Sequence, residues 1–373
     1  MYGKAPRAVD PRPISRDNTR LHDAASAGSA TEGNALMQFT RRNVLMTSLA
    51  ASAATIVGRP ARAASSGLRL GLLHTLSPAP LYLAQARNYF AAAGCPVEFV
   101  FFEAAQPIAA AAVAGDIDIG VTALTGGFFS LAGRGTLKVI GGGLHEQKGF
   151  ELTAILASNA AYAAGLTNVG KLEGHSFGIT QYGSSFHYMV GRIAERAGFD
   201  LKSLQLRPLQ QIGNMLAAVK TGQVDATMAV ASQAKPMVEA GQAHIIGWVG
   251  DYVPYQITAL FAPSRSFEQH SADLHAFCTA YRGGVSDYRA AFLLPKRDPK
   301  VTDAAVADIR KFIFTSDPEG PRKIREGIGW YDEDAALDVA DVRAQLAWFT
   351  QQGMVKGDID PATIIDTGYL PTR

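Results

Sequence analysis

Short apolar runs and amphipathic segments alternate along most of the chain. From residue 68 onward, apolar runs of about five residues are separated by segments whose apolar residues recur at helical spacing. Strands separated by helices are typical of βαβ units, so the pattern predicts mainly parallel sheets flanked by helices. The predicted strands are 68–73, 97–102, 117–121, 137–140, 152–157, 175–179, 204–208, 226–230, 244–248 and 257–261.

The helical segments end at glycines in several places, as helices commonly do. Beyond residue 261 the pattern becomes mainly helical. The predicted helices are 80–93, 106–114, 125–133, 186–197, 213–220, 233–240, 271–293, 303–314, 319–327, 333–352 and 361–366.

Two segments about a hundred residues apart have similar sequences. Residues 115–120 read GDIDIG and residues 222–227 read GQVDAT, and each segment follows an Ala-rich helical stretch. One such segment is a common turn between a helix and a strand, with Gly at the helix end. Because it occurs twice at matching places, it suggests two similar α/β lobes. Asp225 reads as a turn residue.

The first 63 residues have the order of an export signal behind an extension. Residues 1–36 lack apolar periodicity, and Met37 is a second candidate start. Arg41 and Arg42 precede a weakly apolar run at 45–57, which is too short to span a bilayer. The sequence then reads GRPARA, so we predict a twin-arginine-type signal that is cleaved after Ala63. No cysteine lies near that cut, and no later segment is long and apolar enough to cross a membrane.

Composition limits the functional classes. The formal charge of the chain is +2, but residues 1–63 hold nine Lys and Arg against four Asp and Glu, which leaves −3 for residues 64–373. That balance lacks the excess of positive charge that is typical of nucleic-acid-binding proteins. The two cysteines, Cys95 and Cys278, exclude a disulfide-rich scaffold and a thiolate metal cluster. They either pair with each other or are two buried thiols. We expect no metal and no cofactor.

The chain from residue 68 to 370 resembles the periplasmic solute-binding proteins of ABC importers, of the nitrate/sulfonate/taurine type. The segments that carry the resemblance are 80–85 (PLYLAQ) with Tyr89 and Phe90, 115–120, 222–226, and Ala347-Trp348 with 353–355 (GMV). The resemblance implies a two-lobed, type II-like fold with two hinge crossovers, near 152–157 and 257–261. Lobe 1 would comprise 64–152 and 257–373, and lobe 2 would comprise 153–256.

The same resemblance implies a role and partners. The protein would be a monomeric, periplasmic receptor that hands its solute to an ABC permease and ATPase in the inner membrane. The ligand would lie in the cleft between the lobes. Physical reasoning also favours that place, because ligands of open α/β sheets bind beyond the carboxyl ends of the strands. Four loops meet this condition, at 74–78, 122–126, 181–185 and 228–231.

The candidate ligand-binding residues lie in or beside these loops. Gly183 would let the backbone approach a ligand, and Ser184 and Ser185 would add hydroxyls to the free N–H groups of a helix start. Tyr182 and Trp248 end strands and could form an aromatic wall, whereas Phe186, Tyr188 and His187 read as packing residues. The full set of candidates is His74, Thr75, Ser77, Thr122, Thr125, Gln181, Tyr182, Gly183, Ser184, Ser185, Met228, Val230 and Trp248.

The absence of Lys and Arg from the four loops bears on the ligand. A small inorganic oxyanion such as nitrate calls for cationic partners or many donors. We therefore expect an organic solute with a small polar or acidic head on an apolar or aromatic body, such as a sulfonate or an aromatic acid. Two alternatives stay open. The first is an enzyme on the same fold, a lyase or dehydratase of a small aromatic acid, and the second is an exported ligand sensor. We predict no catalytic residues.

Overall fold

The computed structural model describes residues 67–373. The predicted extension, export signal and cleavage site lie outside the described residues. Within residues 67–373, no helix has the length and apolar character needed to cross a membrane.

The first sheet is built mainly from the first third of the described chain. Its strand order is β2-β1-β3-β12-β4. The strands β1, β2 and β3 run parallel, and β12 is antiparallel to both β3 and β4. The strands are β1 (Leu68–Leu73), β2 (Val97–Phe102), β3 (Ile119–Ala123), β4 (Leu137–Gly142) and β12 (Thr258–Pro263). The helices between them are α1 (Ala79–Ala86), α2 (Tyr89–Ala92), α3 (Ala105–Ala114) and α4 (Gly126–Ala132).

The second sheet repeats this plan. Its order is β10-β6-β9-β7-β8, with β7 parallel to β8 and β9, and with β6 antiparallel to β9 and β10. The strands are β6 (Thr153–Ala157), β7 (Ser176–Ile179), β8 (Gln205–Pro208), β9 (Ala226–Val230) and β10 (His244–Trp248). The helices are α5 (Asn159–Ala163), α6 (Ser185–Ala197), α7 (Ile212–Thr221), α8 (Ala231–Glu239) and α9 (Val249–Tyr252), with 3-10 turns at Val169–Lys171 and Leu201–Ser203.

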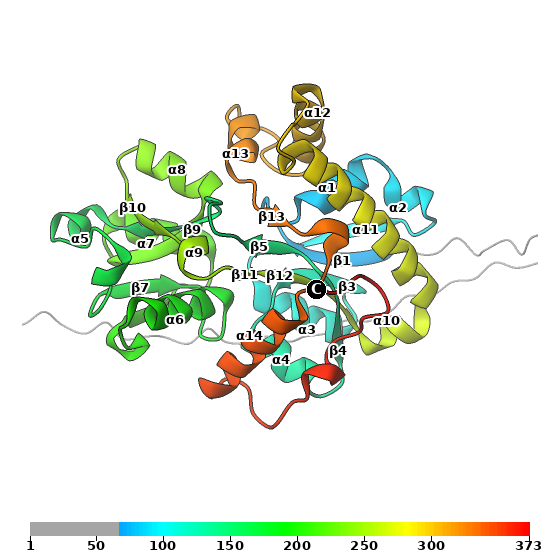
Figure 1. Ribbon diagram of the computed structural model, residues 1–373, viewed down its shortest axis with the longest axis horizontal. Helices are drawn as coiled ribbons and strands as arrows, with labels where there is room; N and C mark the ends of the chain where they lie inside the picture. The colour runs from blue at the N-terminus through cyan, green and yellow to red at the C-terminus, as the bar shows by residue number, and fades with distance from the viewer. Residues whose placement is uncertain (1–66) are drawn as a thin grey trace, which may run out of the picture. The chain divides into compact units, whose positions relative to one another are not determined.

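A small third sheet lies where the chain passes between the two larger ones. Strand β5 (Leu144–Glu146) follows β4 and leads to β6, and β11 (Tyr255–Gln256) follows α9 and leads back to β12. The strand β13 (Trp330–Tyr331) completes the order β11-β5-β13, and all its pairs are antiparallel. Figure 1 shows β5 and β11 between the green second sheet and the cyan and blue strands of the first.

The remaining chain is mainly helical, as predicted, and packs chiefly on the first sheet. The long α11 contacts α1 and α12, and α14 contacts both α4 and α6. The helices are α10 (Ser264–Gln269), α11 (Ser271–Phe292), α12 (Pro299–Arg310), α13 (Gly320–Glu326) and α14 (Val339–Gln351), with 3-10 turns at Glu333–Ala335 and Pro361–Thr363. Cys95 and Cys278 are both buried in this part of the core, where burial raises the pKa of the Cys278 thiol to about 12.

The two similar sequence segments form the same kind of turn between a helix and a strand. Gly115 and Gly222 end α3 and α7 in left-handed conformations, with φ of 94° and 74°. In the first sheet, the Asp118 carboxylate accepts the backbone N–H of Arg69 at 2.9 Å. In the second, the Asp225 carboxylate accepts the backbone N–H of Ser176 at 2.8 Å. Each aspartate therefore ties its turn to a neighbouring parallel strand, which confirms Asp225 as a turn residue.

Several predicted elements differ from the structure for local reasons. The helix predicted at 80–93 is split into α1 and α2 because Asn88 adopts a left-handed conformation, with φ of 59°. The helix predicted at 333–352 is broken near Asp334, which has φ of 56°, and α14 begins only at Val339. The strands β5, β11 and β13 were not predicted, because two or three residues are too short to show a period.

Candidate functional site

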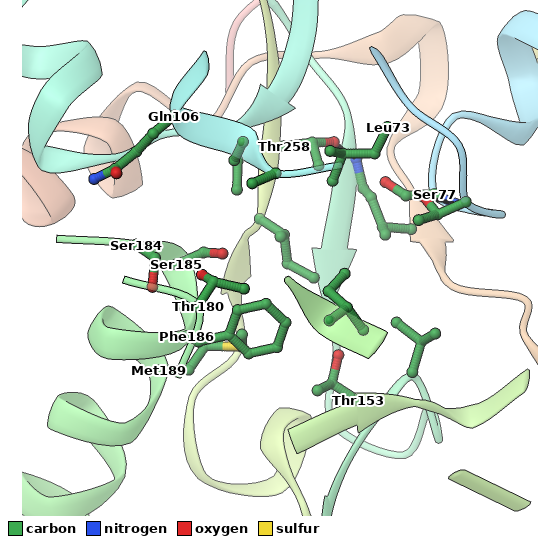
Figure 2. Close-up of a pocket in the computed structure, with 18 of the residues that line it drawn as sticks. Leu73, Ser77, Gln106, Thr153, Thr180, Ser184, Ser185, Phe186, Met189 and Thr258 are labelled. Atoms are coloured by element: carbon green, nitrogen blue, oxygen red, sulfur yellow. Dashed lines mark hydrogen bonds between the residues drawn. The ribbon is translucent and has the colours of Figure 1, made fainter. Parts of the chain in front are cut away.

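A cavity lies between the first and second sheets, at the carboxyl ends of their parallel strands. It encloses about 860 Å³ of empty space, including the part that is open to solvent. The last residues of β1, β3 and β9 and the segments that follow β1 and β7 contribute to its wall, together with the first turns of α3, α6 and α8. Figure 2 shows Leu73 and Ser77 across the cavity from Ser184, Ser185 and Phe186.

Six of the candidates predicted from sequence line this cavity. They are Thr75, Ser77, Gln181, Ser184, Ser185 and Val230. Ser184 is the N-cap of α6, and its side-chain oxygen accepts the backbone N–H of His187. Ser185 is the first residue of the helix, half-buried, and its hydroxyl faces the cavity. The structure therefore gives the two neighbouring serines different tasks.

Four other candidates lie in the loops but do not line the cavity. Thr125 caps α4 by accepting the backbone N–H of Phe128. His74 is exposed, and its Nε2 lies 2.9 Å from the Phe312 carbonyl oxygen. The Tyr182 side chain is 54% exposed, and its hydroxyl donates to the Leu206 carbonyl. Gly183, with φ of 79°, donates its N–H to His187 Nδ1 and touches the rim.

The last three candidates lie within the sheets. Thr122 and Met228 are buried strand residues, with 3% and 0% of their surfaces exposed, so their side chains belong to the core. Trp248 ends β10 at the edge of the second sheet, where the Lys235 ammonium lies 5.8 Å from its ring centroid. This tryptophan packs against a cluster on the far side of β6 and β9 rather than facing the cavity.

Sequence reasoning missed residues that contribute much of the wall. Thr153 and Thr258 begin the strands β6 and β12, and Thr180 follows β7. These three threonines line the cavity because they lie at the strand ends that face it. The signal was present, since Thr153 and Thr258 fall at the predicted crossovers, but a threonine in an apolar run reads as a strand residue.

The apolar part of the wall comes largely from α6. Phe186 and Met189 line the cavity from the first turns of this helix, although Phe186 was predicted to be a packing residue. His187 lies between them in sequence but is buried, as predicted, and burial lowers its pKa to about 4. Its ring is therefore neutral at physiological pH and accepts the Gly183 N–H.

None of the described residues that line the cavity carries a charged side chain. Its polar groups are the hydroxyls of serine and threonine and the amides of Gln106, Gln181 and Gln233. Three helices also begin at its wall, after the N-cap residues Ala104, Gln211 and Val230, and none of these residues makes a side-chain cap hydrogen bond. The first turns of these three helices contain no acidic residue, so the N–H groups and positive dipole ends of the helix starts lie at the cavity wall.

The two sheets are also joined directly at one rim of the cavity. The Gly126 N–H at the start of α4 donates to the Gly183 carbonyl at 2.9 Å. The Gln106 side chain, on α3, donates from Nε2 to the Tyr182 carbonyl at 3.3 Å. On another edge, Arg322 of α13 pairs with Glu239 of α8 at 3.1 Å. Hydrogen bonds and an ion pair thus cross between the two halves of the site at two places in this structure.

Several solved structures share the fold of this chain. An alkanesulfonate-binding protein from Xanthomonas axonopodis pv. citri, bound to MOPS, is 17% identical, with a TM-score of 0.64 over 82% of this chain and 100% of that one. A Candida albicans protein described as having the generic periplasmic binding protein fold is 17% identical, with a TM-score of 0.63 over 82% and 97%. The periplasmic nitrate-binding protein of Synechocystis PCC 6803 is 14% identical, with a TM-score of 0.61 over 80% and 84%.

These likenesses confirm the predicted fold class, an α/β periplasmic-binding-protein fold. No curated protein sequence matches the chain significantly. The family described as "NMT1/THI5 like", however, matches residues 76–291, which is more than half of the chain. The chain therefore belongs to the NMT1/THI5-like family.

Proposed function

We propose that this protein is the exported solute receptor of an ABC importer, and that it captures a small organic solute in the cavity between its two sheets. The two sheets act as lobes, 64–152 with 257–373 and 153–256, that close on the solute by a hinge motion at the crossovers. The permease and ATPase that receive the solute are proposed by analogy with the importer proteins of this fold.

The observation that carries the proposal is the composition of the cavity wall. Hydroxyls, amides and helix starts supply hydrogen-bond donors around the cavity, and Phe186 and Met189 supply an apolar surface among them. Such a wall suits a polar or acidic head on an apolar body, because the head finds donors and the body is removed from water. Nitrate has no body to contact the apolar surface, so we propose a sulfonate-like solute or an aromatic acid.

Binding without turnover suits this wall better than catalysis does. A lyase or dehydratase needs a titratable group within reach of the substrate proton. No described lining residue is Asp, Glu, His, Lys, Cys or Tyr. Asp225, the nearest carboxylate considered from sequence, is engaged in the turn between α7 and β9.

The proposed location is the periplasm. Arg41 and Arg42 ahead of a weakly apolar run support export by the twin-arginine route, with cleavage after Ala63. Sequencing the N-terminus of the protein recovered from the periplasm tests this, and a mature chain that begins at residue 64 is expected. A protein that retains residues 37–63 in the cytoplasm would contradict the export proposal.

The function is tested by a thermal-shift screen of the purified protein. The solutes are methanesulfonate, hexane-1-sulfonate, benzoate, a pyrimidine and nitrate. A solute that binds the folded state raises the melting temperature by mass action. We expect hexane-1-sulfonate or benzoate to raise it and nitrate to leave it unchanged, with no product formed. Conversion of any solute, or a response to nitrate alone, would contradict the proposal.

A further inference from the structure

One buried carboxyl group stands between the two crossovers. Glu146 ends β5, just before the chain passes to the second sheet, and its side chain is 1% exposed. Its partner in the β-ladder is Tyr255, the first residue of β11, where the chain returns to the first sheet. Residues directly opposite in an antiparallel pair place their side chains side by side. Glu146 and Tyr255 therefore meet where both crossovers pass.

The polar atoms of this pair are poorly paired. Among the described residues, none completes a hydrogen bond of ordinary geometry to either carboxyl oxygen of Glu146 or to the Tyr255 hydroxyl. Burial raises the pKa of Glu146, and it outweighs the hydroxyl and backbone N–H of Thr153 and the backbone N–H of Gly250, which lie near enough to favour the ionised carboxylate and so to lower that pKa. A carboxylate buried in this way is costly, whereas a neutral carboxyl group costs much less.

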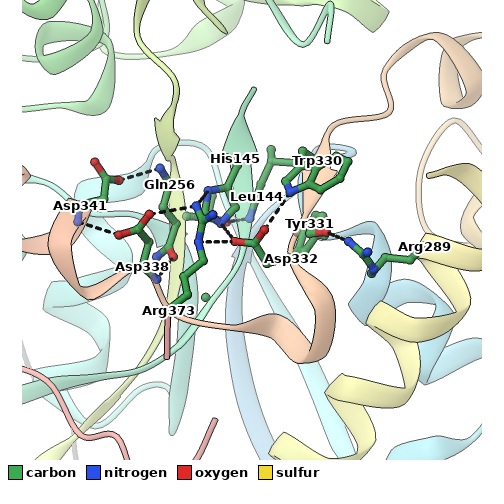
Figure 3. Close-up of polar contacts among 12 residues, drawn as sticks. Leu144, His145, Gln256, Arg289, Trp330, Tyr331, Asp332, Asp338, Asp341 and Arg373 are labelled. Carbon is green, nitrogen blue, oxygen red and sulfur yellow. Dashed lines mark hydrogen bonds and ion pairs between the residues drawn. The ribbon is translucent and has the colours of Figure 1, made fainter. Parts of the chain in front are cut away.

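The surrounding charges do not offset that cost. The titratable groups that face the pair are Asp251 of α9, Asp341 of α14 and Tyr188 of α6, and none of the three can carry a positive charge. On β5 itself, the His145 ring pairs with Asp332 at 3.1 Å and points into a separate network that includes Arg373. Figure 3 shows His145, Asp332, Arg373 and Asp338 joined in that network. The basic groups of the crossover sheet are thus engaged with other carboxylates.

Glu146 also lies directly behind the cavity wall. Thr153, the residue that approaches its carboxyl group, lines the cavity, and so does Leu144 on the same strand. On the partner strand, β11 continues at once into Ile257 and Thr258, which line the cavity as well. A shift of β5 against β11 would therefore move the wall on both crossovers together.

Resting on the solute-receptor function proposed above, we propose that Glu146 is a proton-dependent positioning residue of the cavity. Its neutral form holds β5 and β11 in the arrangement that binds solute. Its ionised form draws water into the crossover sheet, displaces Thr153 and Thr258, and weakens binding. Solute capture is therefore favoured at neutral and acidic pH and declines in alkali.

The expected size follows from the fraction of protein in the binding-competent form. Burial raises the pKa of Glu146 to about 8. If only the neutral form binds, the apparent Kd rises as that fraction falls, by about tenfold between pH 7 and pH 9. Hexane-1-sulfonate is the probe, because its charge is constant over this range, and isothermal titration calorimetry measures its Kd.

The variant Glu146→Gln keeps the shape but cannot ionise, so its Kd is expected to be the same at pH 7 and pH 9. The control Glu173→Gln changes an exposed glutamate and is expected to keep the tenfold change. A Glu146→Gln protein that retains the full pH dependence would overturn the proposal, because another group would then be responsible.

A second measurement needs no ligand. Between pH 5 and about pH 8, native Glu146 holds a proton that the unfolded chain has already lost, so the stability of the wild type falls as pH rises. The melting temperature of Glu146→Gln minus that of the wild type is therefore expected to increase as pH rises over this range. A constant difference would overturn the proposal. If neither hexane-1-sulfonate nor benzoate binds at any pH, the proposed function is contradicted, and this measurement alone decides the state of Glu146.

If the Glu146→Gln variant does not fold, the protonation of Glu146 can still be measured in the wild type. Infrared difference spectra recorded across pH 6 to 10 report a protonated carboxyl band, and its loss near pH 8 is expected. Absence of that band at pH 7 would overturn the proposal.

Discussion

The cavity and the crossover sheet behind it, formed by β5, β11 and β13, differ in their charge although their residues lie close together. Thr153 lines the cavity, yet it also approaches Glu146. The cavity wall has no charged side chain among its described residues, whereas the crossover sheet gathers His145, Glu146, Asp332 and Arg373. When a solute enters the cavity, the groups of the wall lose their bound water. Uncharged donors lose less free energy in this step than ions do.

The crossover sheet has a different requirement. Strands of two or three residues bury little apolar surface, so the backbone pairing alone is weak. Side chains supply the missing constraints. The Asp341 carboxylate accepts the Gln256 N–H at 2.6 Å, and Gln345 donates to the Gln256 carbonyl at 2.9 Å. The comparison suggests that charge in this protein fixes the position of the wall, and that uncharged groups form the wall itself.

The largest effect is expected from breaking the charged side of this comparison. Asp332 bonds to His145, Trp330 and Arg373, and its side chain is 12% exposed. Asp332→Ala is expected to lower the free energy of unfolding by about 2 kcal/mol, because His145 and Trp330 lose a buried partner and Arg373 loses one of its two carboxylates. Urea denaturation measures this loss. The exposed Asp358→Ala is the control, and an equal loss there would contradict the account.

The same aspartate makes a prediction about acid. Its partners His145, Trp330 and Arg373 hold the pKa of Asp332 below its ordinary value, against the opposing effect of burial. A carboxylate of this kind contributes stability above its unfolded pKa and loses it as pH falls. The stability deficit of Asp332→Ala is therefore expected to shrink below about pH 4, where the unfolded wild-type carboxyl group takes up a proton first and the native one follows at lower pH. A deficit that stays constant down to pH 2 would be inconsistent with this role.

The apolar side of the cavity is the next test. Phe186→Ala removes a ring that lines it, and it is expected to weaken hexane-1-sulfonate binding by about tenfold, because the alkyl body loses its apolar surface. Binding of methanesulfonate, which has almost no body, is expected to change little. Calorimetric titration of both solutes provides the comparison. Equal losses for the two would indicate that Phe186 maintains the fold of the site rather than contacting the body.

The two serines at the start of α6 should separate stability from binding. Ser184→Ala removes the cap and is expected to cost about 1 kcal/mol of stability. Ser185→Ala leaves the cap in place and is expected to weaken solute binding by about threefold to tenfold, the value of one hydrogen bond. Thermal melts and titrations of both variants measure these effects. Ser185→Ala with unchanged affinity would remove this residue from the site.

The smallest effect is expected at the rim. Gln106→Ala removes the hydrogen bond to the Tyr182 carbonyl, while the Gly126–Gly183 bond remains. The dissociation rate of bound solute is expected to rise by about threefold, because one of two adjacent cross-cleft bonds is lost. Stopped-flow measurement of solute release tests this. A slower release would show that Gln106 does not help to close the cleft.

Much of the fold could be predicted from sequence because its elements are long enough to show a period. The predicted ranges of β1, β2, β9 and β10 match the observed strands, and Gly115 and Gly222 mark helix ends as expected. The strands β5 and β11 could not be found in this way. Their pairing depends on residues more than a hundred positions apart, which a local pattern does not carry.

The candidate site was predicted at the level of loops rather than side chains. The loops after β1, β7 and β9 reach the cavity, and Thr75, Ser77 and Ser185 line it. In β3, Thr122 is buried beside Ala123, which lines the cavity, because side chains alternate along a strand and the sequence does not show which set faces the ligand. Met228 lies on the same face of β9 as Val230, but Val230 ends the strand at the cavity and Met228 lies deeper in the sheet. The role of Glu146 was invisible from sequence, since it arises from burial.

The proposed solute site is tested most directly by locating bound solute with methionine methyl groups. Met189 lines the cavity, whereas Met237 lies on α8 in a cluster on the far side of the second sheet. The ¹³C-methyl spectrum of the protein is recorded as hexane-1-sulfonate is added, with Met189→Leu used to assign the signal. A saturable shift of the Met189 signal at one equivalent, with Met237 unmoved, is the predicted result. Saturable binding that leaves Met189 unchanged would place the solute elsewhere and contradict the account.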